Sequence, residues 1–146
     1  MPGRKVRMPF ERQSVTHRFE IGKDHVTGYL TIGLLDDGRP SEVFLVVDRE
    51  GSTVRGLCHT LAMTISIALQ YGVTLDKIVR KYKGICFEPN GTTSNPKIRF
   101  CSSIADYVAR YVEARWLTKD NMPGGPSLAI KGNIGDPEIN LEGGGD

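Results

Sequence analysis

The sequence predicts an α+β domain, in which an antiparallel β-meander packs against a long central helix and two further helices. Three early segments are rich in β-branched and aromatic residues and are separated by short turns. Three later segments instead repeat apolar residues at helical spacing. Strands followed by helices, with no internal repeat, indicate one domain of mixed class.

The strands are predicted at residues 15–21, 26–35 and 42–48. In the second strand, Tyr29 and Thr31 alternate with apolar residues, which is typical of a strand with one buried face. The Asp-Gly pair within residues 36–40 favours a tight turn between the second and third strands. Consecutive strands joined in this way form an antiparallel meander.

A long helix is predicted to begin at Ser52 or Thr53, either of which can cap it, and to end at Gly72. Its apolar residues at helical spacing are Val54, Leu57, Cys58, Leu61, Ile65, Ala68 and Leu69, and Met63 and Ile67 widen this surface. A helix that is apolar over so much of its circumference is expected at the centre of the core.

Two shorter helices follow. The first spans residues 74–84, with Thr74 as its cap and Gly84 at its end. The second spans residues 102–117, where Ser103 and Asp106 have the spacing of a capping box. We therefore expect a folded α+β domain over residues 14–117, a basic flexible arm at 1–13 and a Gly/Pro-rich, largely disordered tail at 118–146.

Composition narrows the function classes. The 146 residues are 39% hydrophobic and 25% charged, as in a soluble globular protein, and contain neither a membrane span nor a secretory signal. A cytoplasmic location is the expectation. The net charge of +2 is too small to argue for nucleic-acid binding, although the basic arm could meet phosphates. The three cysteines and three histidines lack metal-ligand spacing, so we expect no metal and no cofactor.

Two polar stretches at helix starts are candidate ligand sites. The first contains Gly51, Ser52, Thr53 and Arg55. A helix start offers unpaired N–H groups and a positive dipole end, glycine permits close approach and arginine adds charge, which together suit a phosphate. The alternative is an ordinary capped helix start.

The second stretch lies between the two shorter helices and is unusually rich in turn residues. Its candidate ligand residues are Phe87, Gly91, Thr92, Thr93, Ser94, Asn95, Lys97 and Arg99. Their side chains can bind a ligand, or they can satisfy the backbone of the loop itself, as Thr and Asn often do in turns. Phe87 can stack on a base or anchor the loop in the core. Because no catalytic motif is present, we expect a binding module and not an enzyme.

Three segments, residues 28–45, 50–79 and 87–112, resemble the C-terminal TSCPD-type domain of vitamin B12-dependent (class II) ribonucleotide reductases. The resemblance covers roughly residues 14–117 and implies the fold, the two polar loops and a link with nucleotides. In that family the radical cysteine, the cobalamin site and the substrate site belong to a separate barrel domain, and a cysteine pair near the C-terminus carries electrons. The residues of that chemistry match nothing here, where the chain ends NLEGGGD without cysteine.

Three functions remain open at this point. The first is a non-catalytic nucleotide-binding module, here a stand-alone chain, that is accessory to a ribonucleotide reductase catalytic chain. The second is a virus-encoded oligomeric protein that sequesters nucleotide-derived defence signals of the cyclic nucleotide or ADP-ribose type. The third is a protein-interaction domain without a small ligand. In each case we expect a homo-oligomer and no membrane association.

Overall fold

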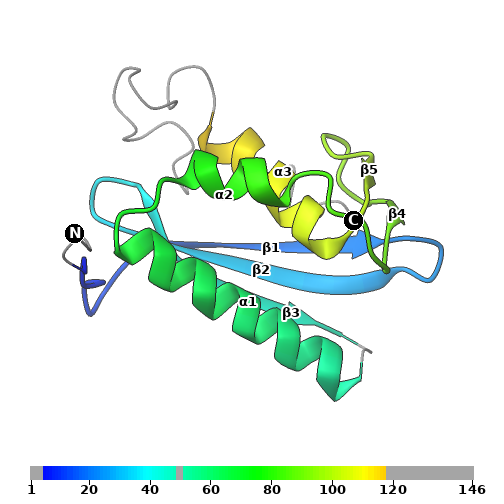
Figure 1. Cartoon of the computed structure of the whole chain (residues 1–146), viewed down its shortest axis with the longest axis horizontal. Helices are drawn as coiled ribbons and strands as arrows, with labels where there is room; N and C mark the ends of the chain where they lie inside the picture. Colours follow the sequence, from blue (N-terminus) through cyan, green and yellow to red (C-terminus); the bar gives the residue numbers. More distant parts are fainter. Residues whose placement is uncertain (1–4, 49–50, 118–146) are drawn as a thin grey trace.

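The computed structural model describes residues 5–48 and 51–117. Within these residues it contains a three-stranded sheet, a two-stranded hairpin and three α-helices, which confirms the α+β class (Figure 1). Residues 1–4 of the predicted arm and all of the predicted tail at 118–146 lie outside the described residues. The predicted boundaries therefore stay predictions.

The sheet is formed by β1 (Ser14–Ile21), β2 (Val26–Leu34) and β3 (Pro40–Val47) in the order β1-β2-β3, and all pairs are antiparallel. The predicted meander is thus confirmed. Alternate residues of each strand are buried, as the period of two requires. Gly28 lies opposite Phe19, and a Cβ at Gly28 would come within 2.4 Å of the Phe19 ring, so this position requires glycine.

Helix α1 (Ser52–Gln70) packs against β3 at the edge of the sheet. Ser66 Oγ donates to the carbonyl of Val43 at 3.2 Å and accepts from its N–H at 2.8 Å, which satisfies the free backbone of this edge strand. The prediction that α1 lies at the centre of the core is wrong. Of its residues only Cys58, Ala62 and Ile65 are buried, and Leu57 is 65% exposed.

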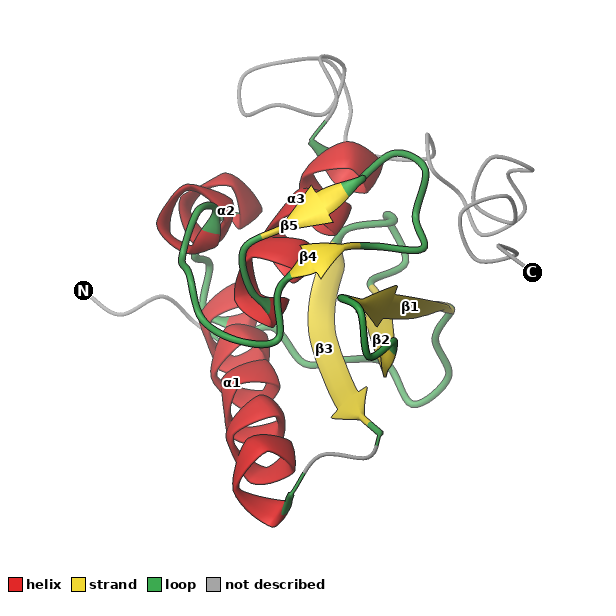
Figure 2. Cartoon of the chain, turned by 90° about the vertical axis from the view of Figure 1, so that its right-hand side faces the viewer, coloured by secondary structure: helices red, strands yellow, loops and turns green. Residues whose placement is uncertain are grey.

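The most deeply buried helix is instead α3 (Ile104–Trp116). Its Tyr107 and Tyr111 rings stack on the buried face of β1, with centroid distances of 4.4 Å from Tyr107 to Phe19 and 4.3 Å from Tyr111 to His17. Helix α2 (Leu75–Tyr82) packs on α3 and not on the sheet (Figure 2). Covered by the sheet on one side and by α2 on another, α3 forms the centre of the core.

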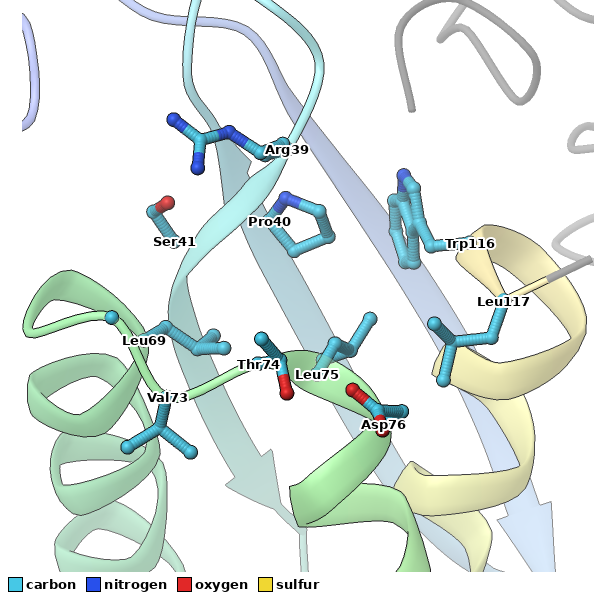
Figure 3. A pocket seen from close by; sticks show the side chains of 11 residues that line it. Arg39, Pro40, Ser41, Leu69, Val73, Thr74, Leu75, Asp76, Trp116 and Leu117 are labelled. Carbon is cyan, nitrogen blue, oxygen red and sulfur yellow. The ribbon is translucent and has the colours of Figure 1, made fainter. Parts of the chain in front are cut away.

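Between α2 and α3 the chain forms a short hairpin of β4 (Gly91–Thr92) and β5 (Phe100–Cys101). The sequence did not predict these strands, because two residues are too few to show a period. At the other end of the core, a cavity of about 250 Å³ lies where α1 ends, β3 and α2 begin, and α3 ends (Figure 3).

Candidate functional site

The polar loop at residues 91–99 is fastened to the end of β1. The Gly22 N–H donates to the Thr92 carbonyl at 2.8 Å, and Ser94 exchanges two hydrogen bonds with the Glu20 backbone, at 3.0 Å and 3.2 Å. Gly91 has a φ of +125°, and a Cβ there would lie 3.3 Å from the Gly22 Cα. Glycine at position 91 therefore permits both the backbone conformation and the close approach to β1.

Other side chains of the loop bind its own backbone. The Thr93 hydroxyl donates to the Ile98 carbonyl and accepts from the Asn95 N–H. Asn95 Oδ1 accepts from the Lys97 N–H at 2.9 Å, which is an Asx turn, and Asn95 is only 1% exposed. Together with Ser94, these two residues hold the loop in shape.

A buried polar chain connects the loop to α3 and β1. Asn95 Nδ2 donates to the Tyr107 hydroxyl at 3.2 Å, and the same hydroxyl lies 2.7 Å from His17 Nε2. Burial lowers the pKa of His17 to about 4, so its imidazole is neutral at pH 7. The 91–99 loop, α3 and β1 are thus joined through the core by one chain of hydrogen bonds.

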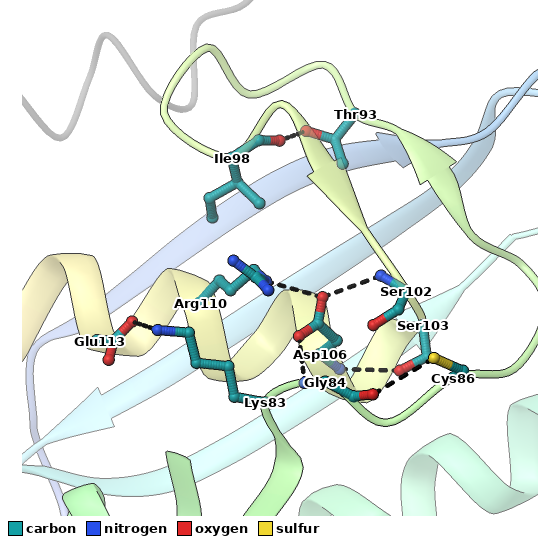
Figure 4. A network of polar contacts seen from close by, with 10 residues as sticks. All are labelled: Lys83, Gly84, Cys86, Thr93, Ile98, Ser102, Ser103, Asp106, Arg110 and Glu113. Carbon is teal, nitrogen blue, oxygen red and sulfur yellow. Dashed lines mark hydrogen bonds and ion pairs between the residues drawn. The ribbon is translucent and has the colours of Figure 1, made fainter. Parts of the chain in front are cut away.

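The carboxylate of Asp106 fastens the other end of the hairpin (Figure 4). Its Oδ1 accepts from the Gly84 N–H at 2.7 Å, and its Oδ2 accepts from the Ser102 N–H at 2.9 Å and from Arg110 at 2.8 Å. Burial alone would raise the pKa of Asp106, but these hydrogen bonds outweigh it and hold the pKa below its usual value. The Asp106 N–H also donates to Ser103 Oγ, which confirms the serine half of the predicted capping box. The Asp106 carboxylate binds Gly84, Ser102 and Arg110 instead of completing the box.

The outer surface of the loop keeps polar groups that this scaffold does not use. A concavity of about 370 Å³ is lined by residues 92–96 and by Arg99. Thr92 and Arg99 are exposed on it, and the Arg99 guanidinium forms no ion pair with the described residues. Lys97 is also exposed, and Phe100 lies directly opposite Thr92 in the hairpin with its ring open to solvent. The concavity therefore presents a cation and a hydroxyl, and an exposed aromatic ring lies opposite Thr92 in the adjoining hairpin.

The second predicted stretch, at the start of α1, is a separate surface. Gly51 is the N-cap, and no side-chain hydrogen bond from the described residues caps the helix, so the predicted Ser52 or Thr53 cap is wrong. Ser52, Thr53 and Arg55 are exposed there. Because α1 follows β3 whereas the 91–99 loop lies against β1, the two stretches belong to opposite edges of the sheet, as Figures 1 and 2 both show.

Phe87 lies near the base of the hairpin, where its N–H donates to the Ser102 carbonyl at 3.0 Å. The side chain is 46% exposed and so does not anchor the loop in the core. It remains a candidate ligand contact at the edge of the hairpin.

Comparison with known proteins gives the family. The family model of the TSCPD domain matches residues 4–115. The chain belongs to the TSCPD domain family. No solved structure gives a significant match.

The curated relatives of this TSCPD domain are vitamin B12-dependent ribonucleotide reductases. The protein of that name from Rhodopirellula baltica is 42% identical over 133 residues, which is 90% of this chain but 13% of the reductase. Those from Streptantibioticus cattleyicolor and Bradyrhizobium diazoefficiens are 38% and 35% identical over 75% and 79% of this chain, and over 18% and 9% of their own lengths. The chain therefore corresponds to a small part of each reductase.

The sequence did not predict the buried polar groups that support the 91–99 loop. His17 follows Val15 and precedes Phe19 and Ile21 at a spacing of two, so strand alternation alone would have placed its ring in the core. No sequence signal pairs it with Tyr107, because 90 residues separate them.

The described part of the chain contains no group of three His, Cys, Asp or Glu side chains arranged to hold a metal ion. Nor does any helix within residues 5–48 and 51–117 have the length and apolar character of a membrane span.

Proposed function

We propose that this TSCPD domain is a non-catalytic nucleotide-binding module that acts with a ribonucleotide reductase catalytic chain. The reductase link rests on family membership and on the names of the curated relatives. The observation that supports a nucleotide site is the concavity on the 91–99 loop. There Thr92 and Arg99 face outward, while other side chains hold the loop in shape.

The groups on this surface match the parts of a nucleotide. A guanidinium such as that of Arg99 can form two parallel hydrogen bonds to phosphate oxygens, and the Thr92 hydroxyl can add a third. The open ring of Phe100 offers a face on which a base can stack. Because the loop is fixed before a ligand arrives, little ordering entropy is lost on binding.

The test is a thermal-shift screen against nucleoside mono-, di- and triphosphates, with inorganic phosphate and cyclic dinucleotides as comparison ligands. A ligand present at 100 times its Kd should stabilise the fold by about 2.7 kcal/mol. We expect Arg99→Gln to weaken nucleotide binding by about 10-fold or more, since it removes a charge-assisted hydrogen bond to phosphate.

Two matched variants locate the site. Lys81→Gln removes a charge from the exposed side of α2 and should leave binding unchanged. Arg55→Gln does the same at the start of α1, on the opposite edge of the sheet. Loss of binding in Arg55→Gln with retention in Arg99→Gln would move the nucleotide to the α1 start. No shift with any nucleotide would refute nucleotide binding and favour an interaction domain.

The screen also separates the reductase role from sequestration of defence signals. Tight binding of cyclic dinucleotides or ADP-ribose derivatives, with none of the ordinary nucleotides, would favour the sequestering function. A reductase module should instead bind nucleotides and form a complex with a reductase catalytic chain.

The outer face of the sheet supports association with another chain. Tyr29, Phe44 and Val46 are exposed there on neighbouring strands. We propose that this face contacts either the catalytic chain or a second copy of the domain, since exposed apolar groups gathered on one sheet face favour protein contact. Light scattering on the isolated chain and on a mixture with the catalytic chain tests both contacts, and a monomer in each sample would refute the proposal.

A further inference from the structure

The cavity at the end of the core has a mostly apolar wall. Its apolar residues come from β3, α1, the α1–α2 turn, α2 and the end of α3: Pro40, Leu69, Val73, Leu75, Trp116 and Leu117 (Figure 3). A cavity of about 150 Å³ is enough to hold benzene. At about 250 Å³, this one has room for a single ring with a short side chain.

One carboxylate interrupts this apolar wall. Asp76, in the first turn of α2, lines the cavity and is only 7% exposed. Its Oδ2 accepts a hydrogen bond from Arg80 at 3.0 Å, whereas its buried Oδ1 has no hydrogen-bond partner among the described residues. A buried acceptor without a donor is costly, so Oδ1 is a position where a ligand donor would be stabilised.

The pKa of Asp76 is lowered, so its carboxylate is ionised at neutral pH. The Thr74 hydroxyl is the main cause that lowers the pKa of Asp76, and Arg80 adds to it against the opposing effect of burial. Across the cavity, the guanidinium of Arg39 pairs with Asp37 at 2.7 Å, within its own turn. A ligand with a positive donor group would therefore meet an ionised carboxylate in the wall of the cavity.

We propose that this cavity binds a small primary amine, with a hydrocarbon body of about one ring against Leu75 and Trp116 and an ammonium group donating to Asp76 Oδ1. An ammonium is favoured over a hydroxyl because a charge-assisted hydrogen bond is the stronger of the two. An anionic ligand is disfavoured by the carboxylate. The site shares no residue with the 91–99 loop and does not depend on nucleotide binding there.

A matched pair of probes tests the charge. 2-Phenylethylamine and 2-phenylethanol share the ring and differ in the group that would face Asp76. Binding to the full chain can be followed by the fluorescence of Trp116, since the sequence contains a single tryptophan. We expect the amine to bind at least about 10-fold more tightly than the alcohol.

A matched pair of variants tests the residue. Asp76→Asn keeps the shape of the side chain and removes its charge, and should weaken amine binding by about 10-fold while changing alcohol binding by less than about threefold. Asp36→Asn makes the same change in the exposed β2–β3 turn and should alter neither. Equal binding of both probes, no binding of either, or unchanged amine binding in Asp76→Asn would overturn the proposal.

A measurement on the unmodified chain covers the case in which Asp76→Asn does not fold. Intermolecular nuclear Overhauser effects should connect the ring protons of the amine with the Trp116 indole and the Leu75 methyl groups. Contacts with any other part of the protein, or the absence of these contacts at saturating amine, would overturn the site.

Discussion

Mild acidification should destabilise this domain through His17. The imidazole is buried between β1 and α3, stacks on Tyr111 and lies within hydrogen-bond distance of the Tyr107 hydroxyl. Burial disfavours its charged form and lowers its pKa from 6.5 to about 4. In the unfolded chain the same imidazole takes up a proton near its ordinary pKa.

The two pKa values of His17, folded and unfolded, set the direction and the size of the change in the free energy of unfolding with pH. Between pH 6.5 and pH 4 the unfolded chain binds the proton and the folded domain does not, so the free energy of unfolding falls as the pH falls. At about 1.4 kcal/mol per pKa unit the full effect, reached below pH 4, is about 3.5 kcal/mol. Relative to pH 7.5, we expect a loss of about 2 kcal/mol at pH 5 and about 3 kcal/mol at pH 4. That is a large share of the roughly 5–15 kcal/mol that stabilises a typical domain.

Urea unfolding at a series of pH values and constant ionic strength measures this loss. His17→Gln removes the titrating group but keeps an amide that can bond to Tyr107, so its stability should vary much less between pH 7.5 and pH 5. His59→Gln makes the same change on the exposed side of α1 and should keep the wild-type dependence. A His17→Gln variant that loses as much stability as the wild type over this range would refute the reasoning.

Four further substitutions test the scaffold. Asp106→Asn should lower the free energy of unfolding by about 3 kcal/mol in urea titrations at pH 7, because it leaves buried donors without their carboxylate; Asp36→Asn, in an exposed turn, should be near neutral. The Asp106 contribution should also disappear as the pH falls below 3.8 towards the lowered pKa of this group. Gly28→Ala should cost about 1–3 kcal/mol, because its Cβ would collide with the Phe19 ring. Gly56→Ala, where a Cβ would meet no described atom within 4 Å, should instead stabilise α1 by about 0.5–1 kcal/mol in the same assay, and a loss there would contradict this account.

The three strands of the sheet and the three helices were predictable because their signals are local. The alternation in β2 and the Asp-Gly turn depend on neighbouring residues, and the structure has the strands close to the predicted positions. Which helix is most deeply buried could not be predicted from such local signals. Apolar residues such as Leu57, Met63 and Ile67 suggested a fully covered α1, yet all three are exposed. An apolar residue on a helix can face the core or an open surface, and only the tertiary arrangement distinguishes the two.

The polar 91–99 loop could be recognised from the sequence, but the roles of its residues could not. Sequence analysis identified the 91–99 loop from its density of Thr, Ser and Asn, and these residue types can bind either a ligand or nearby backbone. The structure assigns a scaffold role to Ser94 and Asn95. Ser94 binds the Glu20 backbone, and Asn95 binds the Lys97 N–H and the Tyr107 hydroxyl. Glu20 and Tyr107 lie outside this loop in the sequence, and no local pattern names them.

The division of roles within the loop decides how a loss of ligand binding can be interpreted. Thr93, Ser94 and Asn95 hold the loop through its own backbone, β1 and α3, so replacing any of them would change the shape of the concavity as well as its chemistry. Thr92 and Arg99 face outward, and their side chains can be replaced without removing any of these contacts. Weaker nucleotide binding with unchanged stability is therefore informative at these two positions. Weaker nucleotide binding after replacement of Asn95 could arise from a change in the shape of the loop, because the Asn95 side chain holds that shape. It would therefore not identify Asn95 as a ligand contact.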